Sequence, residues 1–105
     1  MRIIKISTIR LYYKREPMAE QPLLSWIQEI ENAQWQNHNE LKKQYQNASI
    51  INHKRVVFNI HGNRYRLVAS LSYKFQIAYV IWIGTHAEYD KINVETIKYV
   101  KTNKN

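Results

Sequence analysis

Residues 55–71 read RVVFNIHGNRYRLVASL, and this stretch decides the fold. Two runs of alternating apolar residues flank Gly62-Asn63. That dipeptide is typical of a tight hairpin turn, because both of its residues tolerate a positive φ angle. We therefore predict two antiparallel strands joined at this turn, with His61 opposite Arg64 and Asn59 opposite Arg66.

The alternation sorts the side chains of this hairpin onto two faces, because successive residues of a strand point to opposite sides. The face that we expect to contact the core carries Val56, Phe58, Ile60, Tyr65, Leu67, Ala69 and Leu71. The opposite, polar face carries Arg55, Asn59, His61, Arg64 and Arg66. The sequence thus predicts a cluster of hydrogen-bond donors held on rigid strands.

The chain before the hairpin predicts a short strand followed by helices. The opening residues MRIIKIS favour the strand. A short helix is expected to begin at Ser7 or Thr8 and to run to about Arg15, where Pro17 ends it. Residues 46–52 are expected to form a loop.

Apolar residues at helical spacing predict a longer helix over 20–36. Its stripe consists of Leu23, Ile27, Ile30 and Gln34, with Leu24 and Trp26 beside it. Asn39 is then expected to cap a short helical turn that holds Leu41 and Tyr45.

The chain after the hairpin predicts one more strand and one more helix. Residues 76–83 are apolar on both faces, which favours an interior strand covered on two sides. Residues 88–100 carry acids early and lysines late, as a helix dipole favours, and residues 100–105 are expected to be a disordered tail. The predicted order is β-α-α-β-β-β-α. This is a single α+β domain over residues 1–105, with helices packed on an antiparallel sheet.

Composition limits the class of protein further. Hydrophobic residues make up 45% of the 105 residues and there is no cysteine, so a globular domain without disulfides or thiolate metal sites is expected. No apolar run approaches the roughly 18 residues that span a membrane. The charged N-terminus does not resemble a secretory signal, and we expect a cytoplasmic protein.

Charge is distributed unevenly along the chain. The net charge is +8, and no acidic residue occurs between Glu40 and Glu88. Aromatic residues are interleaved with the cations of this stretch, as is typical of nucleic-acid-binding surfaces. The alternative is a solvated, positively charged surface without a nucleic-acid partner.

The motifs resemble the HigB family of RelE-like toxins. The matching residues are Val57-Phe58-Asn59-Ile60, Gly62-Asn63, Tyr65-Arg66-Leu67 and the run 84–90, which reads GTHAEYD, with Trp26 and Trp35 in the helical region. The resemblance covers about residues 3–97. It departs from many relatives at Ile81, where they carry a cation.

The resemblance implies a RelE/ParE-like fold and a toxin that cleaves mRNA on the ribosome. It also implies an activity without metal or cofactor, and no cluster of residues here has metal-ligand spacing. The implied partner is a helix-turn-helix antitoxin of the HigA type, which forms a hetero-oligomer with the toxin and covers its basic face.

RNA cleavage by the neighbouring 2′-hydroxyl needs a base, an acid and cations around the phosphate. His86 is the leading acid or base, with an uninvolved helix residue as the alternative. Arg66 is the leading phosphate ligand, with a surface ion pair as the alternative. Tyr89 could orient or protonate the reacting groups, stack on a base, or only pack. Asp90 is expected to hold His86 or cap the helix.

The remaining candidates are contacts to RNA rather than to the reacting bond. Arg64 and His61 lie at the hairpin turn and could grip either ribosomal RNA or the phosphate. The other predicted RNA-binding residues are Asn59, Lys54, Arg55 and Lys74. His38 and His53 are interpreted as solvent or core residues.

Three classes of function remain open. The first is the ribosome-dependent endonuclease, the second a non-catalytic nucleic-acid-binding module, and the third a ParE-like toxin that inhibits a protein target. Arg66 and His86 together favour the first class.

Overall fold

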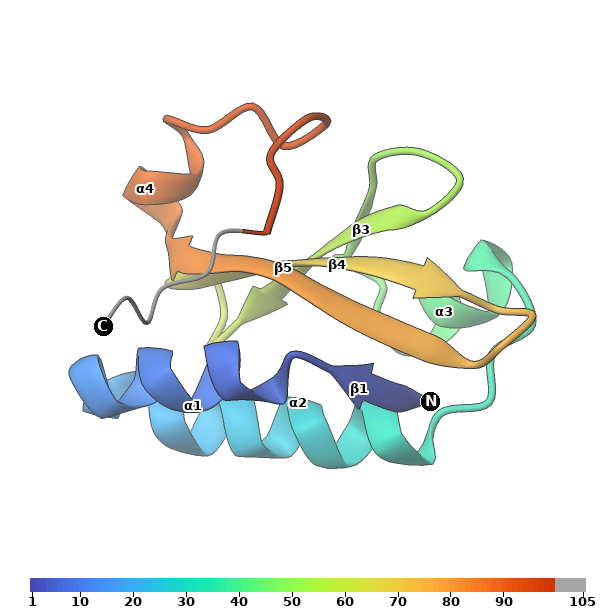
Figure 1. The fold of residues 1–105 in the computed structure, drawn as a ribbon, viewed down its shortest axis with the longest axis horizontal. Helices are drawn as coiled ribbons and strands as arrows, with labels where there is room; N and C mark the ends of the chain where they lie inside the picture. The colour runs from blue at the N-terminus through green and yellow to red at the C-terminus, as the bar shows by residue number, and fades with distance from the viewer. Residues whose placement is uncertain (100–105) are drawn as a thin grey trace.

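The computed structural model describes residues 1–99, which form an α+β fold in three layers. The middle layer is a sheet of β1 (Arg2–Ile4), β2 (Ser49–Ile50), β3 (Arg55–Ile60), β4 (Tyr65–Ser72) and β5 (Ile77–Thr85). The helices α1 (Ile6–Arg15), η1 (Pro17–Ala19) and α2 (Glu20–Asn32) cover one face. The short helix α4 (His86–Tyr89) and the chain after it lie over the other face (Figure 1).

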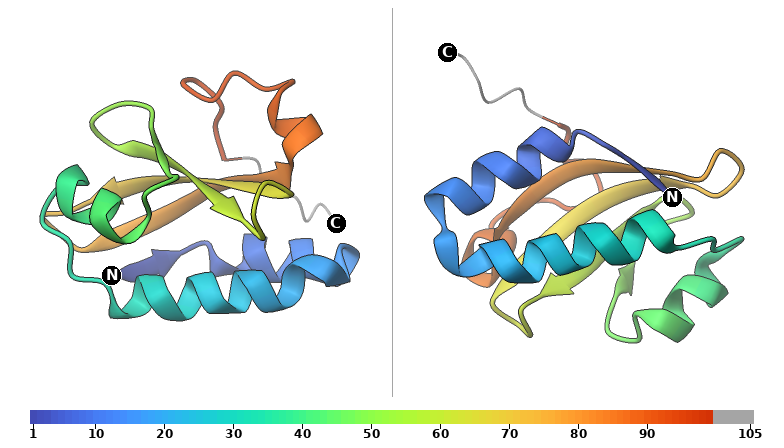
Figure 2. Two further views of the ribbon diagram at one scale, coloured as in Figure 1. Left: turned by 180° about the vertical axis from the view of Figure 1, so that it is seen from behind. Right: turned by 90° about the horizontal axis from the view of Figure 1, so that it is seen from below.

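The sheet is mixed, which corrects the predicted antiparallel sheet. Its strand order is β1-β5-β4-β3-β2, and β1 runs parallel to β5 while the other neighbours are antiparallel. The two views of Figure 2 show β1 beside β5. A strand of three residues carries no sequence signal for its partner, so this pairing follows only from the way α1 and α2 pack against the sheet.

The predicted register of the hairpin is confirmed. Asn59 pairs with Arg66, and the Arg64 amide donates to the His61 carbonyl at 3.2 Å. The turn itself differs, because the positive φ angles fall on His61 (55°) and Gly62 (65°) rather than on Asn63. Every residue predicted for the apolar face is at most 3% exposed and lies in one core cluster.

The opposite face of the hairpin is not uniformly polar. Val57 and Val68 are buried there together with Ile81, beneath Val94 and Ile97 from the C-terminal segment. A second, smaller core therefore lies on the face that the sequence assigned to polar side chains.

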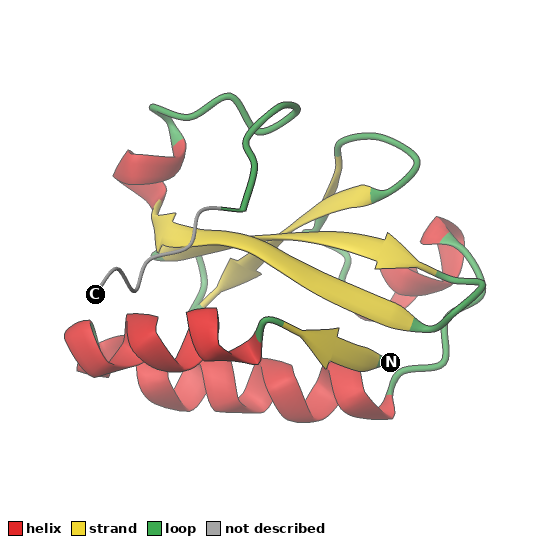
Figure 3. Cartoon of the chain, in the orientation of Figure 1, coloured by secondary structure: helices red, strands yellow, loops and turns green. Residues whose placement is uncertain are grey.

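The prediction of a helix over 88–100 is wrong for the residues that the structure describes. The helix α4 ends at Tyr89, and 90–99 continue as turns and irregular chain (Figure 3). The apolar residues of this segment cover the sheet, and the Arg55 Nη1 atom donates to the Val94 carbonyl at 2.9 Å. These apolar side chains are therefore buried by direct contact of an irregular segment with the sheet. Residue 100 and the predicted tail over 100–105 lie outside the described residues.

The two long N-terminal helices were predicted with errors at their ends. The helix α1 ends at Arg15 before Pro17, as predicted, but begins at Ile6, after Lys5 in a left-handed conformation (φ 68°). The helix α2 ends at Asn32 rather than near residue 36, because Ala33 is extended (ψ 145°). Its buried residues are Leu23, Trp26 and Ile30, while Leu24 is 37% exposed and Gln34 lies beyond the helix.

The segment between α2 and β3 differs from its prediction in two places. The helix α3 (His38–Gln44) is capped by Asn37, whose side chain accepts the Glu40 amide, and not by Asn39. The predicted loop over 46–52 contains β2, which pairs with β3. Two exposed residues, Ser49 and Ile50, are too short a run to be distinguished from a loop by alternation.

The prediction of an interior strand is confirmed by β5, which lies between β1 and β4. Its register shifts opposite Val68 and Ala69, because these residues pair with Trp82 and Val80 and leave Ile81 as the extra residue. The irregularity lets Ile81 and Trp82, which are consecutive, both join the smaller core.

None of the helices described for residues 1–99 has the length and apolar character required to cross a membrane.

Candidate functional site

The turn of the β3–β4 hairpin and the start of α4 meet at one end of the sheet. The Arg64 amide donates to His61, and the His86 amide donates to the Arg64 carbonyl at 3.0 Å. Arg66 pairs with Gly84, which lies two residues before His86, the first residue of α4. Arg66 and His86 therefore lie at the same end of the sheet.

The guanidinium of Arg66 is held by the hairpin turn. Its Nη1 atom donates to the Asn63 and Tyr65 carbonyls, each at 3.1 Å. These bonds leave the N–H groups of Nη2 and Nε available, and these groups suit two oxygens of a phosphate. Arg66 forms no ion pair among the described residues, so the alternative of a surface ion pair is not what the structure has.

His86 is the first residue of α4 and its side chain is 51% exposed. Its Nδ1 atom lies 3.2 Å from Oδ2 of Asp90, one helical turn later, as the sequence predicted for Asp90. An exposed pair of this spacing contributes only about 0.3–0.5 kcal/mol to stability. Its main effect is to orient the imidazole and leave Nε2 facing outward.

Tyr89 lies beside Arg66 and packs into the smaller core. Burial raises the pKa of its hydroxyl, against the opposing effect of Arg66, and Asp90 raises it further. Its ring centroid is 6.3 Å from that of Trp82. The phenol therefore keeps its proton at neutral pH, so it can donate a hydrogen bond, whereas the raised pKa disfavours transfer of the proton.

The structure does not bring all of the predicted residues to this group. The Arg64 guanidinium turns toward the helical layer, where Nη1 lies 3.7 Å from the sulfur of Met18, so its assignment to the polar face is corrected. The His61 ring lies 6.5 Å from the ring of Tyr65, a core residue. Because His61 adopts a positive φ, side chains in the turn do not alternate between the two faces as they do in the strands.

The other predicted RNA-binding residues are spread over the sheet. Asn59 donates weakly to the Asn47 carbonyl (3.4 Å), and Arg55 is engaged by Val94. Lys54 and Lys74 lie at the opposite end of the hairpin, beside the start of β3 and after the end of β4. Arg66 and Lys74 are eight residues apart, which corresponds to about 25 Å of extended chain.

Sequence reasoning missed the device that fixes the start of α4. Thr85 and Glu88 form a capping box, in which the Thr85 side chain accepts the Glu88 amide and Glu88 accepts the Thr85 amide. The spacing Thr-x-x-Glu at 85–88 is a known signal of a helix start and would have placed His86 at the first helical position.

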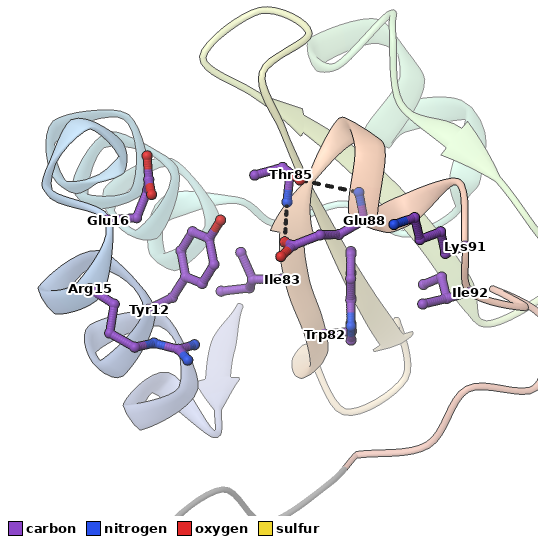
Figure 4. A pocket seen from close by; sticks show the side chains of 9 residues that line it. All are labelled: Tyr12, Arg15, Glu16, Trp82, Ile83, Thr85, Glu88, Lys91 and Ile92. Carbon is purple, nitrogen blue, oxygen red and sulfur yellow. Dashed lines mark hydrogen bonds between the residues drawn. The ribbon is translucent and has the colours of Figure 1, made fainter.

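Sequence reasoning also missed a cleft of about 470 Å³ between α1 and α4. Figure 4 shows Tyr12, Arg15 and Glu16 on one side and Trp82, Glu88 and Lys91 on the other. Arg66, His86 and Tyr89 do not line it. No group of three or more potential metal-ligating side chains occurs within residues 1–99.

The α+β fold with its mixed sheet is consistent with the RelE-like class of toxins. A family model described as HigB_toxin, the RelE-like toxic component of a toxin–antitoxin system, matches residues 19–92. The chain therefore belongs to the HigB toxin family, and the resemblance stated from its motifs is confirmed. As a component of such a system, it has an antitoxin as partner. No curated protein matches the chain.

Proposed function

We propose that this toxin is an mRNA endonuclease that acts on the translating ribosome in the cytoplasm, with an antitoxin of the HigA type as its inhibitor. The observation that supports this most directly is that Arg66 and His86 lie at the same end of the sheet, where the His86 amide donates to the Arg64 carbonyl. A cation and an exposed imidazole are thereby available to one phosphodiester, with a protonated phenol beside them.

The proposed reaction begins with attack of the 2′-oxygen on the adjacent phosphorus. A new P–O2′ bond forms while the P–O5′ bond breaks, which leaves a 2′,3′-cyclic phosphate and a 5′-hydroxyl. One proton leaves the 2′-hydroxyl and one is delivered to the 5′-oxygen. Because RNA alone has this hydroxyl, the mechanism also accounts for selectivity against DNA.

The side chains supply what this reaction needs. Nε2 of His86 faces outward because Asp90 holds Nδ1, so the imidazole can accept or deliver a proton. Because its pKa is raised, Tyr89 stays protonated, so its hydroxyl can donate a hydrogen bond to a phosphate oxygen. The free N–H groups of Arg66 stabilise the negative charge that accumulates on the phosphate oxygens.

The two other classes of function make different use of the same surface. A ParE-like toxin acting on a protein would not need His86, and a non-catalytic binding module would need cations but no proton transfer. Both alternatives predict that removing the imidazole leaves the biological effect unchanged.

The test is to induce the chain in bacteria and to map the ends of transcripts within open reading frames. We expect growth arrest with cleavage, and a loss of cleavage by about 10²–10⁴-fold in Arg66→Ala and in His86→Ala. The matched controls Arg10→Ala and His53→Ala remove the same side chains from exposed positions elsewhere. Both site variants should melt within a few degrees of the wild type, because their side chains lie outside the core.

Unchanged cleavage in either site variant would refute the proposed mechanism. Growth arrest with DNA damage and intact transcripts would favour the ParE-like alternative, and absence of any effect would favour the binding module.

A further inference from the structure

The outer edge of β5 is only partly occupied by a neighbouring strand. The strand β1 pairs with Ile77, Ala78 and Tyr79, whereas β5 continues to Thr85. Within residues 1–99, no strand pairs with 80–85 on the side away from β4. A free edge of this kind presents unpaired backbone groups to any extended chain of suitable sequence.

The register shows which backbone groups point outward. In an antiparallel pair, alternate residues direct their N–H and C=O groups to the partner strand. His86 donates to Arg64 on β4, whereas the Thr85 N–H points the other way and donates to Oε1 of Glu88 at 2.8 Å. By the same alternation, the N–H and C=O groups of Ile83 point to the free edge.

This edge forms the floor of a continuous groove. Two adjoining cavities, of about 470 and 310 Å³, share Tyr12, Arg15, Trp82 and Ile83 among their lining residues. In Figure 4, Ile83 lies between Tyr12 of α1 and Trp82. The α1 wall consists of residues at helical spacing, namely Thr8, Leu11, Tyr12 and Arg15.

The opposite wall depends on a glycine. A Cβ atom at position 84 would approach two carbons of the Trp82 ring to 2.4 and 2.6 Å, so the indole lies directly against the Gly84 backbone. Ile92 and Ile97 extend this wall. Both sides of the groove therefore carry apolar side chains as well as polar ones, and backbone of β5 lies at its floor.

The charges that line the groove favour an acidic occupant. Arg15, Lys91 and Lys98 contribute cations. Two carboxylates also line the groove, since Glu88 accepts the Thr85 amide and Glu16 accepts the Tyr65 hydroxyl at 2.9 Å, so the three cations leave one net positive charge. An extended peptide with alternating apolar and acidic residues would satisfy the edge, the walls and the cations together.

We propose that this groove binds an extended segment of the antitoxin, which adds a strand to β5 at Ile83. The proposal depends on the family's antitoxin partner and not on RNA cleavage. A strand is favoured over RNA because the floor offers the outward-pointing N–H and C=O groups of Ile83, between walls that carry Leu11 and Ile92. The residues proposed for RNA cleavage, Arg66, His86 and Tyr89, do not line the groove, so the two proposed sites can be tested separately.

The experiment measures binding of the purified antitoxin by calorimetry, with His86→Ala as background so that the toxin can be produced. Leu11→Glu places a carboxylate in the wall of the groove and should weaken binding by about 30-fold or more. Leu24→Glu is the matched control, because Leu24 is similarly exposed (37% against 45%) but does not line the groove. This control should change affinity by less than about threefold.

A second measurement identifies the binding mode in a chain whose groove is unaltered. In the complex, the Ile83 amide should exchange with solvent about 100-fold more slowly, and it should show cross-strand contacts to the antitoxin in NMR spectra. Equal affinity of the two leucine variants, or an unchanged Ile83 amide, would overturn the proposal. Protection of this amide by a single-stranded RNA, and not by the antitoxin, would overturn it as well.

The same variants separate this proposal from the proposed function. In an otherwise wild-type chain, Leu11→Glu should still arrest growth but should no longer be neutralised by the antitoxin. If the chain cleaves no RNA, the binding measurements remain decisive for the groove.

Discussion

Two histidines lie at opposite ends of the β3–β4 hairpin, and they differ in what engages their ring nitrogens. His86 contacts Asp90 through Nδ1, and its Nε2 has no partner within residues 1–99. The Nδ1 atom of His38 is 2.5 Å from the Tyr73 hydroxyl, and its Nε2 atom is 3.0 Å from the Asn52 carbonyl. The His86 imidazole is oriented by Asp90 but keeps one ring nitrogen without a partner among residues 1–99. Both ring nitrogens of His38 bond to other segments of the chain.

The two ends have similar composition, since each combines a histidine, a tyrosine and cations. Tyr89 and Arg66 accompany His86, while Tyr73 and Lys74 lie in the chain segment near His38. At the first end, two backbone carbonyls hold the Arg66 guanidinium, and His86 keeps a ring nitrogen that has no partner within residues 1–99. The two ends thus differ less in residue types than in the donors and acceptors left without a partner within residues 1–99, and this difference favours the first end as the proposed site.

The largest effect is expected from removing each histidine in turn. His86→Ala should lower RNA cleavage by about 10²–10⁴-fold with little change in melting temperature. His38→Ala should leave cleavage within a few-fold but cost about 1–2 kcal/mol of stability, because two hydrogen bonds between α3, the β4–β5 turn and residue 52 are lost. Cleavage and thermal unfolding assays on both variants measure this. A loss of cleavage in His38→Ala with an unchanged melting temperature would reverse our assignment of the two ends.

A smaller effect is expected from Tyr73→Phe at high pH. Burial raises the pKa of Tyr73 to about 12, above the ordinary tyrosine value of 10.0. The folded state therefore holds this proton more tightly than the unfolded state, so its contribution to stability is complete below pH 10 and is lost as the pH rises toward 12.

Thermal unfolding between pH 9 and 12 tests this. The wild type should lose stability more steeply than Tyr73→Phe above pH 10, by a difference of a few degrees in melting temperature. Parallel curves for the two proteins would mean that Tyr73 ionises alike in both states.

The smallest effect is expected from the lysines at the far end. Lys54→Gln and Lys74→Gln should each change stability by less than about 0.5 kcal/mol, since Lys54 is exposed and the ammonium group of Lys74 lies 5.4 Å from the centroid of the exposed Phe75 ring. Each should reduce cleavage by less than about threefold, through general attraction to RNA. Cleavage at two salt concentrations measures this. A reduction as large as that of Arg66→Ala would place the phosphate at the far end of the hairpin.

Much of the fold was predictable because its signals are local. Alternation around Gly62-Asn63 gave the register of Asn59 with Arg66 and all seven core residues of the hairpin. The apolar run over 76–83 gave an interior strand. Helix ends were less accurate, because Asn37 and Asn39 are equally good caps in sequence and only the contacts of α3 select the first.

The candidate site was predictable as a set of residues but not as an arrangement. Arg66, His86 and Tyr89 were identified from the motifs, and Asp90 was assigned to hold His86. The direction of Arg64 toward Met18 depends on a positive φ at His61, which alternation does not anticipate. The engagement of Arg55 depends on Val94, which lies 39 residues away.

The sequence by itself determined the hairpin, its core face, the excess of positive charge and the family, because alternation, composition and motifs are properties of neighbouring residues. Tertiary structure decided the parallel pairing of β1, the chain that covers the second face, and which imidazole keeps a free nitrogen. These features arise from contacts between segments distant in the chain, where each group binds whatever partner the packing brings within reach.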